Sequence, residues 1–330
     1  MRVGMNPQKQ AGRQPAVYNH RIVVIVFVPE LSGYYERMFE IFKLTLSSLI
    51  RTVSAKTAIT VVDNACCSVV AQFIREQHDA GHVETVIRHN TNIGKMDAMI
   101  GAARAAREPL ITVTDADVLF EHGWQAAVER VFQAFRKAGA VSPIAVRSNV
   151  HYETSSTLKD IVLGKLQFKW MPIPGNFKKY SQMLASFGQQ TDRDETRPWP
   201  VVTSDGVDAI LGCAHQVMTV RRSVFLWQVP VEPSRILVGN DSERAYLDEP
   251  VDRGGYYRLC LKTTKAYHMG NVTEPWMHDL NEANSRMGPS ESVDVELREV
   301  QSGWLPHKLT ARLYTAAFKR LYKSMERKTL

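Results

Sequence analysis

Two aspartates, Asp115 and Asp117, follow directly on a short, largely apolar run from Leu110 to Thr114. Side chains two residues apart on a β-strand project to the same side, so both carboxylates can face one ligand where the strand ends. This arrangement suits Mg²⁺ or Mn²⁺ carrying a phosphate, because these cations take one or two protein carboxylates and complete their shell with water and phosphate oxygens. The same tripeptide also occurs in ordinary turns, where Asp115 would cap the turn and Asp117 would be solvated.

Alternating strand and helix patterns surround these acids in the first part of the chain. Short apolar runs alternate with stretches of helical period, which predicts an α/β fold with a mostly parallel sheet flanked by helices. The expected strands are 22–28, 58–63, 83–88, 110–114 and 140–146, and the expected helices are 35–53, 67–79, 95–107 and 122–137. Ligands of such sheets bind outside the carboxyl ends of the strands. Because the strand ends carry Pro29, Asp63, His89 and Asp115, we expect one crevice to receive all four.

Further motifs precede and follow the two acids in a fixed order. These motifs are Val28-Pro29, Asp63-Asn64, Asn92-Ile93-Gly94-Lys95 before an alanine-rich helix, Gly212, Arg221-Arg222, Asn240-Asp241 and Tyr267-His268. Over roughly residues 20–270 this order resembles the family 2 glycosyltransferases with the GT-A fold. Each motif is weak alone, and their ordered combination makes the resemblance specific.

The resemblance implies a site for a nucleotide-sugar donor, with a UDP-sugar favoured, and for a divalent cation, Mn²⁺ or Mg²⁺. By its match to the family, Asp63 would accept hydrogen bonds from the nucleobase or ribose, and His268 would contact the metal or a phosphate. The expected donor-binding residues are Pro29, Asp63, Arg88, Asn92, Lys95 and Asp115, and the expected metal ligands are Asp115, Asp117 and His268. The metal would act as a Lewis acid on the departing diphosphate.

Each of these side chains also has an ordinary structural interpretation. Asp63 could form the turn after its strand without any ligand. Basic residues on loops, such as Arg88 and Lys95, are commonly only solvated. A single histidine such as His268 more often has a structural role, and imidazole suits Mn²⁺ less well than oxygen ligands do.

An inverting transfer also needs a base that takes the proton from the acceptor hydroxyl. The family's Glu-Asp element corresponds to Asn240-Asp241, so Asp241 is the first candidate and Glu243 is the reserve. Asn240 departs from the acid that is usual at its position. Asp241 could instead cap a helix over 241–249.

The composition bounds the organisation of the chain. With 330 residues, of which 44% are hydrophobic and 23% charged, it is typical of a soluble globular protein. Four cysteines without paired spacing are expected to be free thiols in a reducing cytoplasm.

We expect a flexible N-terminal tail over 1–17, a nucleotide-sugar-binding half over 18–146, and an acceptor-binding and catalytic half over 147–290. Within it, the weakly periodic stretch 147–210 predicts an acceptor-side insertion in the form of a lid or loop, with a partly helical packing element as the alternative.

The C-terminal region, 291–330, is expected to be a basic amphipathic helical region, and most of the net charge of +7 lies in its last part, 305–330. Between Leu305 and Leu330, seven lysines and arginines accompany a single glutamate. An apolar residue recurs every four positions at Leu309, Leu313, Ala317, Leu321 and Met325, which predicts a basic amphipathic helix. Through residues 305–328 this helix could lie on an anionic membrane surface or dock on the catalytic body; nucleic acid is the less favoured partner.

The sequence therefore predicts a cytoplasmic, metal-dependent, inverting glycosyltransferase for a saccharide or lipid-linked acceptor, in surface polysaccharide or glycoconjugate synthesis. Peripheral attachment to the inner membrane face is an option that the C-terminal helix leaves open. A nucleotidyltransferase is the second enzymatic hypothesis. It is disfavoured because the sequence has no glycine-rich phosphate loop. A catalytically degenerate scaffold that binds membrane or nucleic acid is the non-enzymatic alternative, and Asn240 is its best support.

Overall fold

A ten-stranded sheet runs through the centre of the structure, a computed structural model that describes residues 3–12, 14–191, 194–298, 300 and 307–326, the last four by their backbone alone. The strands are β1 His20–Val26, β2 Thr57–Asn64, β3 Thr85–His89, β4 Leu110–Asp115, β6 Ala138–Ser142, β7 Gln167–Pro172, β8 Pro198–Ser204, β9 Val207–Leu211, β10 Val217–Arg221 and β11 Tyr257–Leu261. Their order across the sheet is β3-β2-β1-β4-β10-β6-β11-β9-β8-β7. A separate two-stranded sheet pairs β5 Val118–Phe120 with β12 Ala266–His268.

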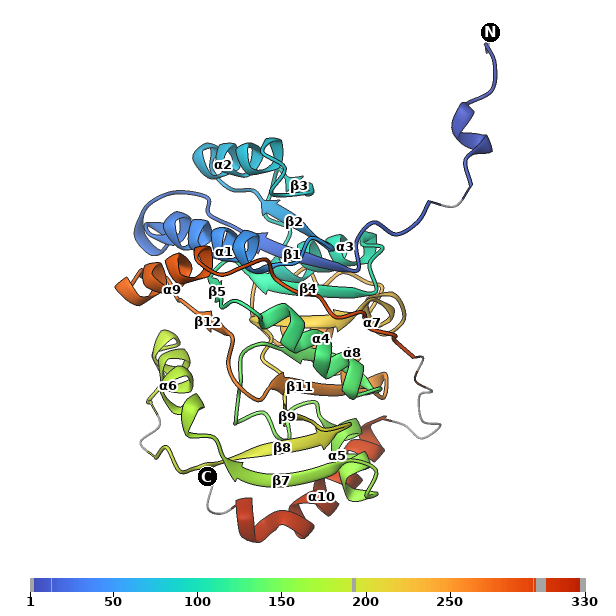
Figure 1. Cartoon of the computed structure of the whole chain (residues 1–330), viewed down its shortest axis with the longest axis vertical. Helices are drawn as coiled ribbons and strands as arrows, with labels where there is room; N and C mark the ends of the chain where they lie inside the picture. The colour runs from blue at the N-terminus through green and yellow to red at the C-terminus, as the bar shows by residue number, and fades with distance from the viewer. Residues whose placement is uncertain (1–2, 13, 192–193, 299, 301–306, 327–330) are drawn as a thin grey trace.

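Helices cover both faces of the large sheet (Figure 1). The α-helices are α1 Met38–Thr52, α2 Ser68–Asp79, α3 Lys95–Ala105, α4 Trp124–Ala134, α5 Ser155–Val162, α6 Phe177–Ser186, α7 Arg222–Trp227, α8 Glu249–Arg253, α9 Pro275–Ser285 and α10 His307–Glu326. Shorter helical turns are η1 Pro7–Gln10, η2 Gly33–Tyr35, η3 Pro174–Asn176 and the π-helical turn η4 Arg244–Asp248. The described residues before Tyr18 are exposed and extend from the body.

The first strand, β1, shows how the sequence builds a layer on each side of the sheet. Ile22 and Val24 belong to a buried apolar cluster with α1 and α4, whereas Val23 and Ile25 belong to a second cluster with α3 and α7. Because strand side chains alternate between faces, a continuous apolar run requires that both faces be covered. The expected α/β class, with helices on both sides of a central sheet, is confirmed.

The four strands β3, β2, β1 and β4 pair in parallel, so their carboxyl ends lie along one edge of the sheet. Beyond β4 the pairing is mixed: β6 and β11 are parallel, and the remaining neighbours are antiparallel. The parallel part is the part that the sequence pattern predicted. It places the ends of four strands where one ligand can reach them.

The segment 147–210 contains strands and helices rather than the lid or loop that we expected. It includes α5, β7, α6 and β8, and antiparallel pairs of β7, β8 and β9 extend the sheet. The loop interpretation is wrong because prolines obscured the strand pattern. Pro172 and Pro198 are paired at the ends of β7 and β8, where a missing N–H group is tolerated. The alternative interpretation, a partly helical packing element, agrees better with the structure. A role of this segment in acceptor binding stays a prediction.

The C-terminal helix α10 docks on the body through its aromatic side. The Phe318 side chain is fully buried, and its ring centroid lies 5.0 Å from that of Phe168 on β7. The Tyr322 ring lies 4.8 Å from the same phenylalanine ring. Leu309 and Leu313, from the predicted leucine stripe, remain 59% and 57% exposed. The expected amphipathic helix is therefore present over its described residues, but the aromatic side docks and the leucine stripe does not.

The region before α10 differs from the predicted helical region over 291–330. Residues 291–298 form no helix in the structure and follow the body instead, where the Val293 N–H group donates to Glu129 Oε2 at 2.7 Å. Residues 301–306 and 327–330 of that prediction lie outside the described residues. Within the described part of the chain, no helix has the length and apolar character that a membrane span requires. The four cysteines are free, as expected.

A buried ion pair joins several segments of the second half of the chain. Arg258 on β11 and Asp248 in η4 form this pair with both side chains fully removed from solvent. The Tyr152 hydroxyl donates to Asp248 Oδ2 at 3.1 Å, and His215 Nδ1 lies 3.3 Å from the same oxygen. Arg258 also donates to the Tyr152 carbonyl at 2.7 Å. Removing one partner of such a pair leaves an uncompensated buried charge.

Substitution Asp248→Ala should therefore lower the free energy of unfolding by about 3–5 kcal/mol, because Arg258 would stay buried without its carboxylate. Chemical denaturation at neutral pH measures the change. Glu291→Ala is the matched control, since its side chain is 82% exposed, and its effect should stay within about 0.5 kcal/mol. Equal, small effects of both substitutions would contradict the assigned role of the pair.

Candidate functional site

The two acids lie at the carboxyl end of β4, as the sequence predicted. Asp115 is the last residue of β4, and Asp117 lies in the turn before β5; their side chains are 19% and 16% exposed. The backbone on each side is fixed: the Asp115 N–H group donates to the Gln216 carbonyl at 2.9 Å, and the Asp117 carbonyl accepts from the Met269 N–H group at 2.8 Å. Both carboxylates are therefore held in a defined position.

Lys95, the first residue of α3, supplies the cation nearest to Asp115. Its Nζ lies 2.7 Å from Asp115 Oδ1, 2.9 Å from Oδ2 and 3.8 Å from Glu243 Oε1. Burial alone would lower the pKa of the Lys95 amine, but the carboxylates of Asp115, Glu243 and Asp117 together outweigh burial and raise it. Burial raises the pKa of Asp115 more than Lys95 lowers it, and the nearby Asp117 carboxylate raises it further. One ammonium thus faces two carboxylates, those of Asp115 and Glu243.

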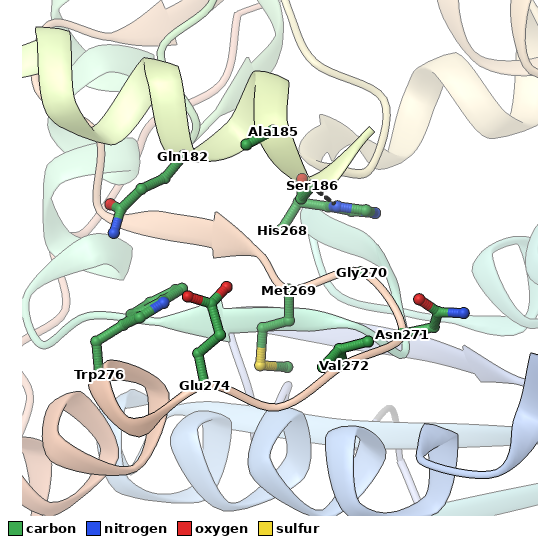
Figure 2. Close-up of a pocket in the computed structure, with 10 residues that line it drawn as sticks. All are labelled: Gln182, Ala185, Ser186, His268, Met269, Gly270, Asn271, Val272, Glu274 and Trp276. Carbon is green, nitrogen blue, oxygen red and sulfur yellow. Dashed lines mark hydrogen bonds between the residues drawn. The ribbon is translucent and has the colours of Figure 1, made fainter. Parts of the chain in front are cut away.

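His268, at the end of β12, contacts Asp117. Its Nε2 lies 3.2 Å from Asp117 Oδ2, and its Nδ1 lies 2.8 Å from the Ser186 hydroxyl on α6 (Figure 2). The ring stacks on Phe187 with centroids 4.3 Å apart. Burial would lower the pKa of His268, but the hydrogen bond with Asp117 and the charges of Asp117 and Asp115 together outweigh burial and raise it. His268 therefore lies beside the proposed metal ligand, although it is bonded to the carboxylate itself.

The donor set fits a hard divalent cation. Asp117 Oδ1 is buried and has no hydrogen-bond partner among the described residues, which is costly unless a ligand satisfies it. Asp115 itself is engaged by Lys95, so a cation at Asp115 would compete with that amine. Asp117 is consequently the residue best placed to hold the ion.

A three-residue group of potential metal ligands lies elsewhere, at the start of α10. Ligand atoms of Glu153, Asp252 and His307 lie within 4.8 Å of one another. Asp252 already accepts hydrogen bonds from the N–H groups of Ser155 and Ser156 at 3.0 and 2.7 Å, and His307 Nε2 lies 3.0 Å away. Burial would raise the pKa of Asp252, but these hydrogen bonds outweigh burial and lower it. The group caps α5 and anchors α10, and we assign it no metal.

The structure separates the two candidates for the base. Asp241 is 81% exposed and lies 3.9 Å from Arg244 Nη1, away from the acid cluster. Glu243 is 14% exposed, faces Lys95 and accepts a hydrogen bond from the Ser242 hydroxyl at 3.0 Å. Burial would raise the pKa of Glu243, but its own N–H group and the Lys95 charge outweigh burial and lower it. Only Glu243 of this pair is brought to the cluster.

The backbone before Glu243 is unusual. Gly239, Asn240 and Asp241 have φ angles of 71°, 49° and 63°, so three successive residues adopt the left-handed region. Each non-glycine residue in that region costs roughly 1–3 kcal/mol. The predicted helix over 241–249 begins one residue later, at Ser242, and includes the π-helical turn η4. This strained turn is what directs Asp241 and Glu243 to different sides.

The remaining predicted donor residues lie along the same edge of the sheet. Asp63 is buried at the end of β2, where its Oδ1 accepts from the Cys66 N–H group at 2.7 Å and its Oδ2 lies 3.2 Å from Arg88 Nη1. Asn92 Oδ1 accepts from the Gly94 N–H group at 2.9 Å and so shapes the turn into α3. Pro29 is exposed after β1. Asp63 thus forms the turn after β2, as its structural interpretation predicted. Its partner Arg88 can still contact a ligand.

The backbone conformation and the close packing at position 94 require a glycine before Lys95. Its φ angle is 96°, and an added Cβ would lie 2.3 Å from the Ile236 carbonyl oxygen. The Leu237 carbonyl accepts from the Lys95 N–H group at 2.8 Å, and Asp97 accepts from the Ser234 N–H group at 2.7 Å. The loop before Gly239 therefore covers the N-terminus of α3 and occupies the Lys95 N–H group. Lys95 can contact a ligand only through its side chain.

Sequence reasoning missed two side chains of this site. Tyr34, 66% exposed in the loop after β1, lies near both acids: burial raises its pKa, and the Asp117 and Asp115 charges raise it further. Ser186 on α6 holds His268 in place. Neither carried a motif, since Tyr34 lies in the short turn η2 and Ser186 falls in the segment that we interpreted as irregular.

Residues 34–189 match the family model described as Glycosyl transferase family 2. The matched segment contains Asp63, Lys95, Asp115 and Asp117 and ends well before Asp241. The resemblance stated from the motifs is therefore confirmed over this part of the chain. A search of curated proteins found no match to the sequence.

Several solved structures resemble the chain at low identity. GalNAc-T7 with UDP, GalNAc and Mn²⁺ has a TM-score of 0.47 and 13% identity, over 78% of this chain and 45% of that one. The mannosyltransferase PcManGT from Pyrobaculum calidifontis with GDP-Man and Mn²⁺ has a TM-score of 0.45 and 14% identity, over 94% and 72%. S. aureus TarS 1-349 with UDP has a TM-score of 0.44 and 9% identity, over 92% and 72%. The chain thus spans less than half the length of the GalNAc-T7 chain, and at these TM-scores we base no conclusion on the similarities.

Proposed function

We propose, from the glycosyl transferase family 2 domain that residues 34–189 carry, that this chain moves a sugar from a nucleotide donor to a hydroxyl group of a saccharide or lipid-linked acceptor. The transfer inverts the configuration of the sugar and requires Mn²⁺ or Mg²⁺, and a UDP-sugar is the favoured donor. The observation that carries the proposal is the pair of acids Asp115 and Asp117 at the end of β4, with the Lys95 amine 2.7 Å from Asp115.

The reaction must neutralise a departing nucleoside diphosphate. A divalent cation held by Asp117, with Asp115 and His268 as further ligands, would supply that charge as a Lewis acid. Lys95 is a second source of positive charge, because the Asp115 carboxylate raises its pKa and keeps the amine protonated. A phosphate oxygen and Asp115 would then share this amine.

The nucleoside would lie toward β2 and β3. Arg88 remains 43% exposed while it pairs with Asp63, so its guanidinium can contact a base or a phosphate without leaving that carboxylate. Asn92 fixes the turn that brings Lys95 to the site. Pro29, exposed at the end of β1, would border the base.

The acceptor proton would pass to Glu243. This carboxylate lies in the cluster, and its lowered pKa keeps it ionised at neutral pH, ready to accept a proton. Asp241 occupies the position that the family resemblance favours and points to solvent in this conformation. Its turn of three left-handed residues would have to rearrange before Asp241 reached the acceptor.

The exposed face of α10 supports attachment to an anionic lipid surface. Leu309, Leu313 and Leu321 are 59%, 57% and 62% exposed, while the aromatic side of the helix is occupied by the body. Lys308, Arg312, Lys319 and Arg320 are exposed beside the leucines. Basic residues near an anionic surface contribute about 1 kcal/mol each, and leucines add buried apolar area. A lipid-linked acceptor and a location at the inner membrane face agree with this arrangement.

Substitution Asp117→Ala should abolish the Mn²⁺-dependent stabilisation of the chain by nucleotide sugars. A ligand at about 100 times its dissociation constant stabilises by about 2.7 kcal/mol, which thermal denaturation with a panel of nucleotide sugars, with and without Mn²⁺, can detect. Asp79→Ala, an exposed aspartate at the end of α2, is the control. Undiminished stabilisation in Asp117→Ala would contradict the metal assignment, and release of pyrophosphate in place of a nucleoside diphosphate would indicate nucleotidyl transfer.

Substitution Glu243→Gln should lower kcat by about 10²–10⁴-fold, the usual contribution of a positioned base, with donor binding largely retained. Asp241→Asn should change kcat only a few-fold, because that side chain is 81% exposed. Release of the nucleoside diphosphate gives the rates, and a donor titration by calorimetry reports binding. The reverse order of effects would place the base at Asp241.

The double substitution Leu309→Ser with Leu313→Ser should weaken binding to vesicles of phosphatidylcholine with phosphatidylglycerol. Cosedimentation measures binding, and added salt should reduce it because the basic residues are exposed. Leu31→Ser is the control, because that leucine is 44% exposed in the loop after β1, away from α10. Equal binding to pure phosphatidylcholine, or binding of duplex DNA through the same face, would contradict the lipid assignment.

A further inference from the structure

A pocket of about 290 Å³ lies beside His268. It opens between α6 and the segment from β12 to the start of α9 (Figure 2). The lining residues are Gln182, Ala185, Ser186, His268, Met269, Gly270, Asn271, Val272, Glu274 and Trp276. Small-molecule sites usually measure about 300–1,000 Å³, so this pocket suits a ligand of one or two rings.

The lining chemistry favours a neutral ring with many hydroxyl groups over a phosphate. None of the lining residues is a lysine or arginine, and Glu274 adds a carboxylate. The carboxamides of Gln182 and Asn271 make no hydrogen bond with other described residues, so both are available to hydroxyl groups. Figure 2 shows Gln182, Glu274 and Trp276 pointing toward one another across the pocket. An aromatic face with a few placed polar groups matches the apolar face and the hydroxyl rim of a sugar ring.

Trp276 is held in place by contacts outside the pocket. Its ring lies edge-on to that of Tyr267, with centroids 5.6 Å apart. The Tyr267 hydroxyl donates to Glu121 Oε2 at 2.5 Å, and Lys179 Nζ lies 3.0 Å from the same oxygen. These bonds join β12 to α6, the two sides of the pocket. The aromatic surface is therefore positioned before any ligand arrives, which lowers the entropy cost of binding.

The pocket is connected to the acid cluster through a single side chain. His268 lines the pocket, and its Nε2 lies 3.2 Å from Asp117 Oδ2. Its Nδ1 lies 2.8 Å from the hydroxyl of Ser186, which also lines the pocket. A ring seated beside Trp276 would thus lie next to the residues that hold the donor diphosphate.

We propose that this pocket binds the sugar ring of the acceptor whose hydroxyl group receives the transferred sugar, with Trp276 as its aromatic platform and Gln182 as its hydrogen-bonding partner. The inference rests on the proposed transferase function, which it deepens by naming a saccharide as the acceptor class. In this proposal the donor binds along the sheet edge from Asp63 to Lys95, and the acceptor binds from the side of α6 and α9.

The test is direct binding of saccharides to the full chain in the presence of Mn²⁺ and UDP. An array of common mono- and disaccharide glycosides is the probe, and ligand-detected NMR gives affinities. Trp276→Ala and Gln182→Ala should each weaken the best binder by at least about tenfold, as truncation of a central binding residue does. Trp276→Phe, which keeps an aromatic ring, should recover part of the affinity. Thermal denaturation of each variant establishes that it is folded.

Trp227→Ala is the matched control, because that tryptophan is 76% exposed on α7 and lines no part of the pocket. Absence of any Trp276-dependent saccharide binding across the array overturns the inference. Loss of UDP-sugar affinity in Trp276→Ala, without loss of UDP affinity, assigns the pocket to the donor sugar and overturns it too. A wild-type chain that binds nucleotide sugar but no saccharide refutes this inference alone, whereas a chain that binds neither refutes the proposed function.

Discussion

The ion pair between Lys95 and Asp115 is the interaction on which the candidate site depends. Two carboxylates at the end of one strand repel each other when buried, and Asp115 has a raised pKa for that reason and because of burial itself. The Lys95 amine, 2.7 Å from Asp115, reduces this repulsion without removing it. The protein thus keeps an arrangement of acids that is incomplete by itself and that a divalent cation with a phosphate would complete.

Much of the first half could be predicted from the sequence because its signals are local. Continuous apolar runs indicated strands covered on both faces, and β1 does supply side chains to two clusters. Since parallel strands end at one edge, their order along the chain was enough to bring Asp63 and Asp115 to the same side. Gly94 could be recognised as part of a motif, although its steric reason, the Ile236 carbonyl, lies far along the chain.

The second half could not be predicted to the same depth because its signals are non-local. β7 and β8 are antiparallel strands at one end of the sheet, and their prolines led us to interpret them as a loop. The choice between Asp241 and Glu243 depends on three left-handed residues, which no periodic pattern encodes. The apolar stripe of α10 could be recognised in the sequence, but the side of the helix that meets the body depends on Phe168, a residue of the segment interpreted as irregular.

Docking of the aromatic side of α10 has a consequence for orientation. Phe318 and Tyr322 pack on Phe168 and so hold the helix in one rotational setting about its axis. The leucine row then faces a fixed direction relative to the large sheet, and a surface contacted by that row would meet a helix that is already folded. No ordering cost would be added on contact, and the angle at which the crevice meets that surface would be set by three aromatic rings.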